Sequence, residues 1–495
     1  MGQELPLAEN TKWFDLSATC MGNQSAPLLV SSKGRYVWSD KPFKFRMDGG
    51  KLEIESDFEK VSASSAGKSL KEAYLAASEK FFPPDGKIPP EIFFNRPQYN
   101  TWIDMVRDQT QDGALAYADG IVKNNFPTGV FMVDGGWERY YGFFQFRADK
   151  FPNPKKLNGA LHQMGFKVIY WVGPFVAPAG GDFLDRQAAG LLVADKKGRL
   201  LKSGVREAAI IRWWSGFSAT FDTANPKARG YVRAILEKLQ KDCDIDGFKF
   251  DGGDMHHVVG ENLAFGEKGK IAADYTYGWA QIGLDFPYNE YRACWKMGGK
   301  ALVQRLHDKN YSWKDLEKII PDMISAGLLG HAYTCPDMVG GGDYMSFKNL
   351  DRDKLDQRFI VRSAQVHALM PMMQFSLAPW KVLDKKHLDL CRDAANLHVK
   401  FGDYILEQAR HASKTGEPIV RAMEYEFPNG GFDNCKDQFM LGGKYLVAPV
   451  ITPADKRSVK LPEGRWRDEL GAIYEGGKTV EIDAPIARLP YFERL

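Results

Sequence analysis

Residues 246–254, DGFKFDGGD, have the composition of a short buried strand that ends at an acidic residue followed by two glycines. The segment before them, ARGYVRAILEKLQKD (228–242), carries apolar residues at helical spacing, and Pro226 stands where the first turn of a helix favours proline. A helix that leads directly into a buried strand is typical of parallel sheets, in which helices connect successive strands. This stretch therefore predicts an α/β fold.

The same alternation continues on both sides of this stretch. Strand-like segments stand at GVFMVD (129–134), KVIYWVGPFV (167–176), FDTANP (221–226), ALVQRLHD (301–308) and GLLGHAY (327–333), and a helix is expected around LNGALHQMG (157–165). Alternation repeated this often predicts parallel strands, arranged either as a barrel or as a doubly wound sheet. No Gly-rich dinucleotide fingerprint or phosphate loop opens any of the helices, which favours the barrel.

The flanking regions have a different texture. FKFRMDGGKLEIES (43–56) predicts a β-hairpin with its turn at Asp-Gly-Gly, SLKEAYLAASEK (69–80) predicts a helix, and the proline-rich segment 81–98 marks a boundary. The strand-like pieces near the C-terminus are separated by Gly- and Pro-rich turns. We expect three domains: an N-terminal β-sandwich-like domain (1–92), a (β/α)₈ TIM barrel (93–412) and a small all-β domain (413–495).

Composition narrows the class of protein. A chain of 495 residues with 44% hydrophobic residues can bury a large core over two or three domains. Its 66 Lys and Arg against 63 Asp and Glu argue against nucleic acid as the main partner, because such binders usually carry a clear basic excess. The 13% of aromatic residues fit either sugar stacking or ordinary core packing. The six cysteines form no C-x-x-C pair, which argues against a zinc site.

The sequence predicts neither a membrane span nor a cofactor. It has no run of 18 apolar residues, and its opening MGQELPLAEN lacks the basic and apolar segments of a secretory signal. The start Met1-Gly2 is compatible with an addition in front of a mature secreted or periplasmic chain, so the compartment stays open. The nine histidines include no pair spaced for a metal site, and we expect no metal or organic cofactor.

Four acidic residues stand where predicted strands end: Asp134, Asp222, Asp251 and Asp308. In a (β/α)₈ barrel the active residues lie at this end of the strands, so we expect the four to converge on one rim. A single aspartate in such a place is most often a helix cap or a salt-bridge partner. Several together fit glycoside hydrolysis, which needs one carboxyl group on each side of the scissile bond.

Asp251 is the strongest of these candidates. Gly252 and Gly253 after it leave room for a ligand, and Lys249 lies on the same side of the strand, two residues away. A nearby ammonium group would keep Asp251 ionised and nucleophilic. The alternative is that Lys249 and an aspartate form a buried structural pair.

These segments resemble glycoside hydrolase family 31 over nearly the whole chain. The resemblance implies that Asp251 is the nucleophile and that HDKNYSWKDL (307–316) carries the acid/base, Asp308, 57 residues later. Arg292, sixteen residues before Asp308, stands where the family's sugar-contacting arginine lies. The segments that resemble the end of the family's barrel and its adjoining β domain are TGEPIVRAMEYEFP (415–428), QFMLGGKYLVAPVI (438–451) and LPEGRWRD (461–468).

Two departures bear on the substrate. The family's α-glucosidases carry Asp-x-Asp at the end of the first barrel strand, whereas VDGGW (133–137) keeps Asp134 and places Gly136 second. Their Arg-Asn-His near the seventh strand is replaced by MMQFSLAPW (372–380). Because an unmatched buried hydroxyl is costly, these changes argue against glucose. Segments such as RWWSG (212–216) resemble the branch with the animal myogenesis-regulating glycosidase and bacterial α-galactosidases.

The resemblance implies a retaining, exo-acting α-galactosidase that acts on an oligosaccharide or glycoconjugate by double displacement. Asp134, Lys249 and Arg292 would orient sugar hydroxyls or tune Asp251. The sugar pocket would be walled by Trp137, Trp171, Trp213 and Trp214. Three alternatives stay open: an α-glucosidase or α-xylosidase of the same family, transfer to an acceptor sugar, and a non-catalytic sugar-binding protein on this fold. Oligomeric state is not predicted.

Overall fold

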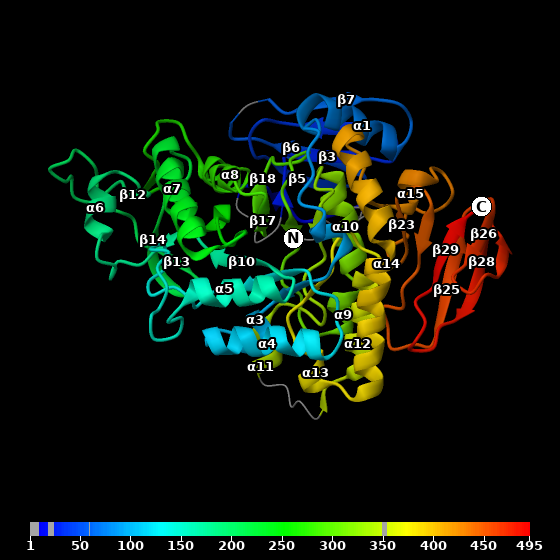
Figure 1. Ribbon diagram of the computed structural model, residues 1–495. Coiled ribbons are helices and arrows are strands. Elements are labelled where there is room, and N and C mark those ends of the chain that lie inside the picture. Colours follow the sequence, from blue (N-terminus) through cyan, green and yellow to red (C-terminus); the bar gives the residue numbers. More distant parts are fainter. Residues whose placement is uncertain (1–8, 18–23, 59, 349–353) are drawn as a thin grey trace.

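A closed barrel of eight parallel strands forms the centre of the computed structural model, which describes residues 9–17, 24–58, 60–348 and 354–495 (Figure 1). In chain order its strands are β8 (Gln98–Asn100), β9 (Val130–Val133), β10 (Lys167–Val172), β15 (Gly247–Phe250), β17 (Tyr288–Tyr291), β19 (Gln304–Arg305), β20 (Thr334–Cys335) and β21 (Gln374–Phe375). A parallel bridge between Met338 and Gln374 closes the ring, where Val339 N donates to Gln374 O at 2.8 Å. The predicted (β/α)₈ barrel is confirmed.

Helices cover the outside of the barrel. The longer ones are α4 (Gln111–Lys123), α5 (Pro154–Gln163), α7 (Pro226–Cys243), α8 (Ala272–Gly283), α10 (Ile319–Leu328), α12 (Gln357–Ala368) and α14 (Lys385–Thr415). Asn153 and Asn225 cap α5 and α7 by accepting hydrogen bonds from backbone N–H groups of the first turn, and each helix then begins with proline. The helices expected around 157–165 and 228–242 are therefore confirmed.

Two expected barrel strands are wrong. GLLGHAY (327–333) holds the end of α10 and the turn after it, because a short apolar run does not distinguish a buried helix end from a strand. FDTANP (221–226) follows β14 (Gly216–Thr220), which pairs antiparallel with β11 (Phe175–Val176) and β13 (Ile211–Trp213). These three strands form a small separate sheet inserted after β10, outside the barrel.

The N-terminal region forms two three-stranded antiparallel sheets, as expected of a sandwich-like domain. One contains β1 (Phe14–Asp15), β5 (Lys44–Asp48) and β6 (Lys51–Glu55), and the other contains β3 (Leu28–Ser31), β4 (Arg35–Trp38) and β7 (Ser62–Ser65). The predicted β5–β6 hairpin is confirmed, and Gly49 and Gly50 at its turn have φ of 55° and 73°. The helix predicted at 69–80 is α1 (Leu70–Phe81).

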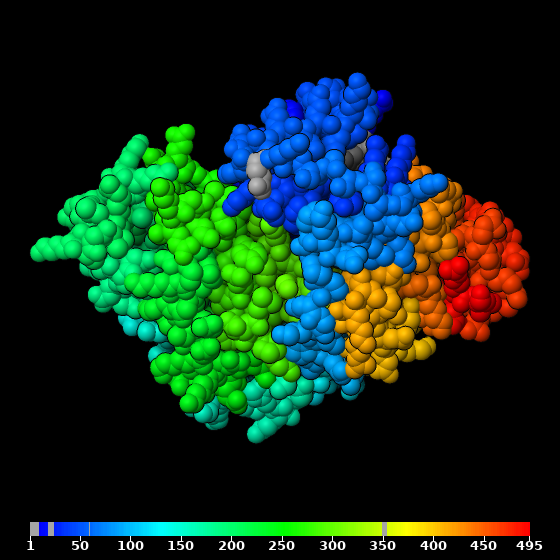
Figure 2. Space-filling model, turned by 90° about the horizontal axis from the view of Figure 1, so that it is seen from above, coloured from blue at the N-terminus to red at the C-terminus, as the bar shows by residue number. Residues whose placement is uncertain are grey.

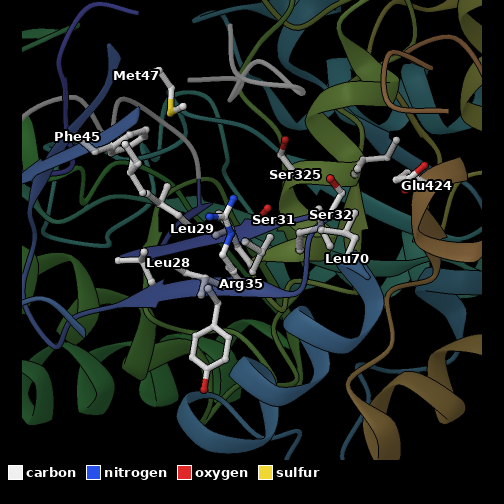
Figure 3. Close-up of a pocket in the computed structure, with 18 of the residues that line it drawn as sticks. Leu28, Leu29, Ser31, Ser32, Arg35, Phe45, Met47, Leu70, Ser325 and Glu424 are labelled. Carbon is white, nitrogen blue, oxygen red and sulfur yellow. The ribbon is translucent and has the colours of Figure 1, made fainter. Parts of the chain in front are cut away.

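A cavity of about 820 Å³ lies between these N-terminal sheets, α10 and the C-terminal domain (Figure 3). Apolar side chains such as Leu28, Leu29 and Phe45 line it, together with Ser325 of α10 and Glu424 of α15 (Met423–Glu426). None of the four strand-end aspartates is among the described residues that line it. The cavity is therefore separate from the mouth of the barrel.

The N-terminal region is also joined directly to the barrel. Strand β2 (Gln24–Ser25) pairs in parallel with β18 (Cys294–Trp295), which follows β17. The Gln24 side-chain amide donates to the backbone oxygens of Arg305, at 3.0 Å, and of Arg292, at 3.2 Å. The N-terminal region therefore contacts the ends of two barrel strands at the level of the expected site.

The C-terminal region is the small all-β domain that the sequence predicts. Six strands form one sheet: β22 (Val420–Arg421), β23 (Phe439–Leu441), β24 (Tyr445–Val447), β29 (Tyr491–Arg494), β26 (Arg465–Asp468) and β27 (Ile473–Glu475). A separate pair is formed by β25 (Lys456–Leu461) and β28 (Lys478–Asp483). Trp466, Leu446 and Phe492 are buried in its core. Figures 1 and 2 show this domain at the opposite end of the molecule from α6 (Phe183–Ala188).

Short elements complete the fold. They are α2 (Ile92–Asn95), α3 (Trp102–Met105), α9 (Trp313–Leu316), α11 (Tyr344–Lys348), α13 (Pro379–Val382), β12 (Ala194–Asp195), β16 (Leu263–Ala264) and a 3₁₀ turn at Met255–His257. The domain boundaries at 92/93 and 412/413 stay a prediction, and α14 continues past the second of them to Thr415. Across the described ranges, no helix has both the length and the apolar character needed to cross a membrane.

Candidate active site

Three of the four strand-end aspartates meet at the mouth of the barrel. Asp134 directly follows β9, Asp251 directly follows β15, and Asp308 stands three residues after β19. Because the strands are parallel, these positions lie at the same end of the barrel. Asp222 is the exception, since it follows a strand of the inserted sheet, where its buried carboxyl group accepts a hydrogen bond from Gly266 N at 2.5 Å. The expectation that all four converge is wrong for Asp222.

Asp251 is held by three hydrogen-bond donors. Its Oδ1 accepts from Arg292 Nε and from Gly252 N, both at 2.8 Å, and its Oδ2 accepts from Trp171 Nε1 at 2.9 Å. Burial disfavours the charged carboxylate, but the positive charges of Arg292 and Lys249 outweigh it and hold the pKa of Asp251 far below its usual range. With its side chain still 14% exposed, Asp251 is an oriented, ionised carboxylate that a ligand can reach.

Arg292 is shared between two aspartates. In addition to Asp251 it binds Asp254, whose carboxyl group is fully buried, at 3.2 Å from Nη2. Burial opposes the charge of the guanidinium group, yet the surrounding aspartates raise its pKa above the ordinary value. Trp214 lies over Arg292, with the ring centroid 5.0 Å from Cζ. Arg292 therefore fixes the orientation of Asp251, and the sugar contact implied for it stays a prediction.

Lys249 binds Asp134 and not Asp251. Its Nζ lies 2.6 Å from Asp134 Oδ2, and both side chains are buried. β9 and β15 are both neighbours of β10, so the pair bridges two strands across the interior of the barrel. This matches the buried structural pair considered from the sequence, although the partner is on another strand. The positive charge of Lys249 still lowers the pKa of Asp251.

Replacing Lys249 with methionine is expected to lower the free energy of unfolding by about 3–5 kcal/mol, because Asp134 would remain buried without its cation. Denaturant unfolding followed by tryptophan fluorescence measures the change. Lys238→Met is the matched control, since Lys238 pairs with Asp242 on the exposed surface of α7. Equal unfolding midpoints for the two variants would contradict the expectation that the buried Lys249–Asp134 pair stabilises the fold more than the exposed pair does.

Asp308 shares one arginine with a second aspartate. Arg305 Nη1 donates to Asp308 Oδ1 at 2.6 Å and to Asp337 Oδ1 at 2.7 Å. The Asp308 side chain is 34% exposed, whereas Asp337 is fully buried. Burial opposes ionisation of Asp308, but Arg305 and Arg292 outweigh it and lower its pKa to about 2. Burial and the charge of Asp308 raise the pKa of Asp337 to about 6. The two carboxyl groups together therefore hold one proton between pH about 2 and pH about 6.

The four tryptophans expected to wall a sugar pocket occupy different environments. Trp171 and Trp214 face the site through Asp251 and Arg292, and Trp214 is 46% exposed. Trp213 is buried and stacks on Phe175, with ring centroids 3.8 Å apart. Trp137 is fully buried, and its Nε1 donates to Trp171 O at 2.7 Å. Trp137 therefore lies buried behind Trp171, which corrects its expected place in the wall of the site.

The two positions at which the sequence departs from α-glucosidases offer no charged side chain to a sugar. Gly136 has φ of 119°, and an added Cβ would lie 2.9 Å from Arg107 O. Ser376 is buried, and its Oγ accepts from Ile103 N at 2.7 Å, while Gln374 Nε2 donates to Glu290 at 2.6 Å. The numbering of the barrel strands also needs correction, because β8 is the first strand. Asp134 therefore follows the second strand rather than the first, and Gln374 lies in the eighth strand rather than near the seventh.

Sequence reasoning missed Asp254, Glu290, Arg305 and Asp337. Asp254 and Arg305 lie within segments that the sequence singled out, and Arg305 stands in the short strand just before Asp308. A charged residue inside an otherwise apolar strand was the available signal, because a buried arginine needs carboxylate partners. The identity of those partners depends on which strands lie beside β19, here β17 and β20.

Family models cover most of the chain. Residues 88–408 match the model described as "Glycosyl hydrolases family 31 TIM-barrel domain", and residues 416–495 match "Glycosyl hydrolase family 31 C-terminal domain". Mouse myogenesis-regulating glycosidase is 28% identical over 82% of this chain and 57% of its own length. Alpha-xylosidase XylQ of Lactiplantibacillus pentosus is 24% identical over 92% of this chain and 60% of its own. The chain thus spans about 60% of the length of these relatives.

Solved structures share the fold. A Flavobacterium johnsoniae GH31 dextranase complexed with glucose has a TM-score of 0.83 and 24% identity, covering 95% of this chain and 60% of its own. A GH31 alpha-xylosidase from a soil metagenome, complexed with xylose, has a TM-score of 0.82 and 20% identity, covering 97% and 75%. At these identities the likeness speaks for the architecture alone.

Proposed function

The chain belongs to glycoside hydrolase family 31, and from that premise we propose that it is a retaining, exo-acting α-galactosidase. The observation that carries the chemistry is a pair of carboxyl groups in contrasting environments at the mouth of the barrel. Asp251 is held by three donors as an oriented carboxylate, whereas Asp308 is 34% exposed and shares Arg305 with the fully buried Asp337. Retaining hydrolysis needs such a nucleophile and such an acid/base.

The reaction proceeds in two displacements. Asp251 attacks the anomeric carbon with an oxygen lone pair, while the bond from that carbon to the leaving oxygen breaks and Asp308 protonates that oxygen. Asp308 then takes a proton from water, whose oxygen attacks the same carbon and releases Asp251. Arg292 and the Trp171 indole hold Asp251 in the orientation that both steps require.

We propose that bound sugar shifts the shared proton from Asp337 to Asp308. A sugar at the mouth of the barrel displaces water from the partly exposed Asp308 carboxyl group, which favours its neutral form. The Asp337 carboxylate, in contrast, accepts hydrogen bonds from Arg305, from Lys309 N at 2.7 Å and from Gly342 N at 2.9 Å. These donors stabilise the charged form of Asp337, but burial still keeps its pKa above that of Asp308, so we propose that the loss of water around Asp308 on sugar binding shifts the proton to Asp308.

Galactose as the sugar is supported by the two departures from α-glucosidases. Gly136 and Ser376 leave out the carboxylate and the imidazole that α-glucosidases direct at glucose hydroxyls. A site that lacks these partners leaves the equatorial hydroxyls of glucose unmatched, which is costly on burial. The similarity to myogenesis-regulating glycosidase supports the same branch of the family.

An α-xylosidase is the second candidate. Two curated relatives, each 24% identical over 92% of this chain, are named alpha-xylosidases. Xylose lacks the hydroxymethyl group at C5, so a pocket closed around that position would favour it over galactose. A panel of aryl glycosides separates the two sugars.

Among 4-nitrophenyl α-galactoside, α-glucoside and α-xyloside, we expect the galactoside to have the highest kcat/KM. The margin is expected to be about 100-fold or more, as for sites whose buried polar groups match one hydroxyl pattern. Release of nitrophenol measures the rate, and proton NMR of the first product is expected to show the α anomer. Preference for the xyloside would replace the proposed sugar. Sugar binding without release of product would support the non-catalytic alternative.

A further inference from the structure

Arg305 is a buried cation at the end of β19 that faces three carboxyl groups. Its side chain is 2% exposed, and its Nη1 donates to Asp308 and Asp337. Its Nε also lies 3.4 Å from Glu290 Oε1, on the neighbouring strand β17. A buried arginine that serves several carboxylates holds their relative positions, because each lost contact would leave a charge unpaired.

Asp337 is the fixed point of this group. It is fully buried, and backbone N–H groups of Lys309 and Gly342 bind its Oδ2. Asp308, by contrast, projects into the mouth of the barrel, and within the described part of the chain the hydrogen bond to its carboxyl group comes from Arg305. Arg305 therefore ties the exposed acid/base candidate to an immobile anchor.

We propose that Arg305 is the positioning residue of the acid/base, which holds Asp308 toward the leaving oxygen and stabilises the carboxylate that forms as its proton departs. The inference rests on the proposed two-step hydrolysis and adds a residue to it. In the first step the Asp308 O–H bond breaks, its proton goes to the leaving oxygen, and the electron pair stays on Asp308. The guanidinium group beside that oxygen is more strongly bound after the transfer than before it, which lowers the barrier of this step.

The second carboxylate on Arg305 limits this effect. Because Asp337 shares the same Nη1 atom, part of the guanidinium charge is already neutralised. Asp308 can therefore still take back a proton from water in the second step. Arg292 stands in the same relation to the nucleophile, since it binds Asp251 together with the buried Asp254. Each proposed catalytic carboxylate is thus held by an arginine that a second, buried carboxylate also binds.

The test compares Arg305→Met with Arg305→Lys on two α-galactosides of different leaving-group ability. With melibiose, whose leaving group needs protonation, kcat/KM is expected to fall about 10²–10³-fold in Arg305→Met, within the range of general acid catalysis. With α-galactosyl fluoride, which needs little help from an acid, the fall is expected to be less than about tenfold. Arg305→Lys is expected to recover part of the loss with melibiose.

A pH profile distinguishes positioning from structural damage. Removing the cation favours the protonated form of Asp308, so the high-pH limb of kcat/KM is expected to move to higher pH in Arg305→Met. Asp337→Asn removes the competing charge and leaves Arg305 to Asp308 alone, so the limb is expected to move to lower pH. This second variant keeps the inference testable if Arg305→Met does not fold.

Arg362→Met is the matched control, since Arg362 is a buried arginine that binds backbone oxygens of Ala484 and Arg488 away from the barrel mouth. Arg362→Met is expected to change kcat/KM by the same factor for both substrates and to leave the pH dependence of kcat/KM unchanged. The inference would be overturned if kcat/KM fell by the same factor for both substrates in Arg305→Met and if the high-pH limb of kcat/KM did not move in the Arg305 and Asp337 variants. If the wild type prefers another sugar, the proposed substrate fails, and the same comparison on that sugar's glycosides decides the role of Arg305.

Discussion

Replacing Asp251 with alanine is expected to lower kcat/KM for 4-nitrophenyl α-galactoside by about 10⁴-fold or more, because the covalent route loses its nucleophile. The three donors that now orient the carboxylate would face an empty position, so no other group nearby takes over its role. Initial rates measure the change, and an unfolding transition like that of the wild type shows that the variant is folded.

A trapping experiment separates attack by Asp251 from a merely electrostatic role. A fluorinated α-galactosyl fluoride, whose glycosyl-enzyme breaks down slowly, is expected to label the peptide that contains Asp251 and no peptide in Asp251→Ala. Asp222→Asn is the matched control, because Asp222 also follows a strand but lies in the inserted sheet. Near-wild-type turnover by Asp251→Ala, or loss of turnover in the Asp222 variant alone, would end the assignment.

Replacing Asp308 with alanine is expected to lower kcat/KM about 10²–10⁴-fold for melibiose and much less for α-galactosyl fluoride. The difference arises because only the poorer leaving group needs a proton in the first step. In the second step the variant lacks its general base, so added azide, which needs none, is expected to raise kcat for the fluoride. The expected product is α-galactosyl azide, identified by mass spectrometry and NMR.

Asp337→Ala is the control that identifies the acid. Both carboxyl groups bind the same arginine, but Asp337 is fully buried and Asp308 is 34% exposed. Only Asp308 is placed to meet a leaving oxygen, so azide is expected to leave Asp337→Ala unchanged. Azide rescue in the Asp337 variant and not in the Asp308 variant would exchange the two roles.

Elements with local causes could be predicted from the sequence. The Pro226 helix, the Asp-Gly-Gly hairpin and the strand that ends at Asp251 each depend on residues adjacent in the chain. The inserted sheet could not be separated from the barrel, because FDTANP (221–226) stands directly before α7, as a barrel strand would, and the pairing of β14 with β11 joins residues far apart in the chain. The burial of Trp137 likewise depends on how its loop folds back beneath Trp171.

The sequence predicted which residues belong to the site better than it predicted the contacts among them. Lys249 and Asp134 are 115 residues apart and belong to strands on either side of β10, so their contact depends on how the three strands are arranged in the barrel. Arg305 meets Asp337 through the adjacent strand β20, a pairing that strand alternation does not specify. Motif resemblance could nominate Asp251 and Asp308, and the three-dimensional register decides which arginine holds each of them.

The amide of Gln24 has a consequence for how this protein can be divided. Residues 88–408 match the barrel model, yet Gln24 lies well before them and binds the backbone oxygens of Arg292 and Arg305. The two arginines that hold the proposed catalytic carboxylates are thus tied together from outside the barrel. A barrel transferred to another family member without β2 would lose both hydrogen bonds from Gln24. An exchange of barrels that is meant to preserve catalysis should therefore include β2 as well as residues 88–408.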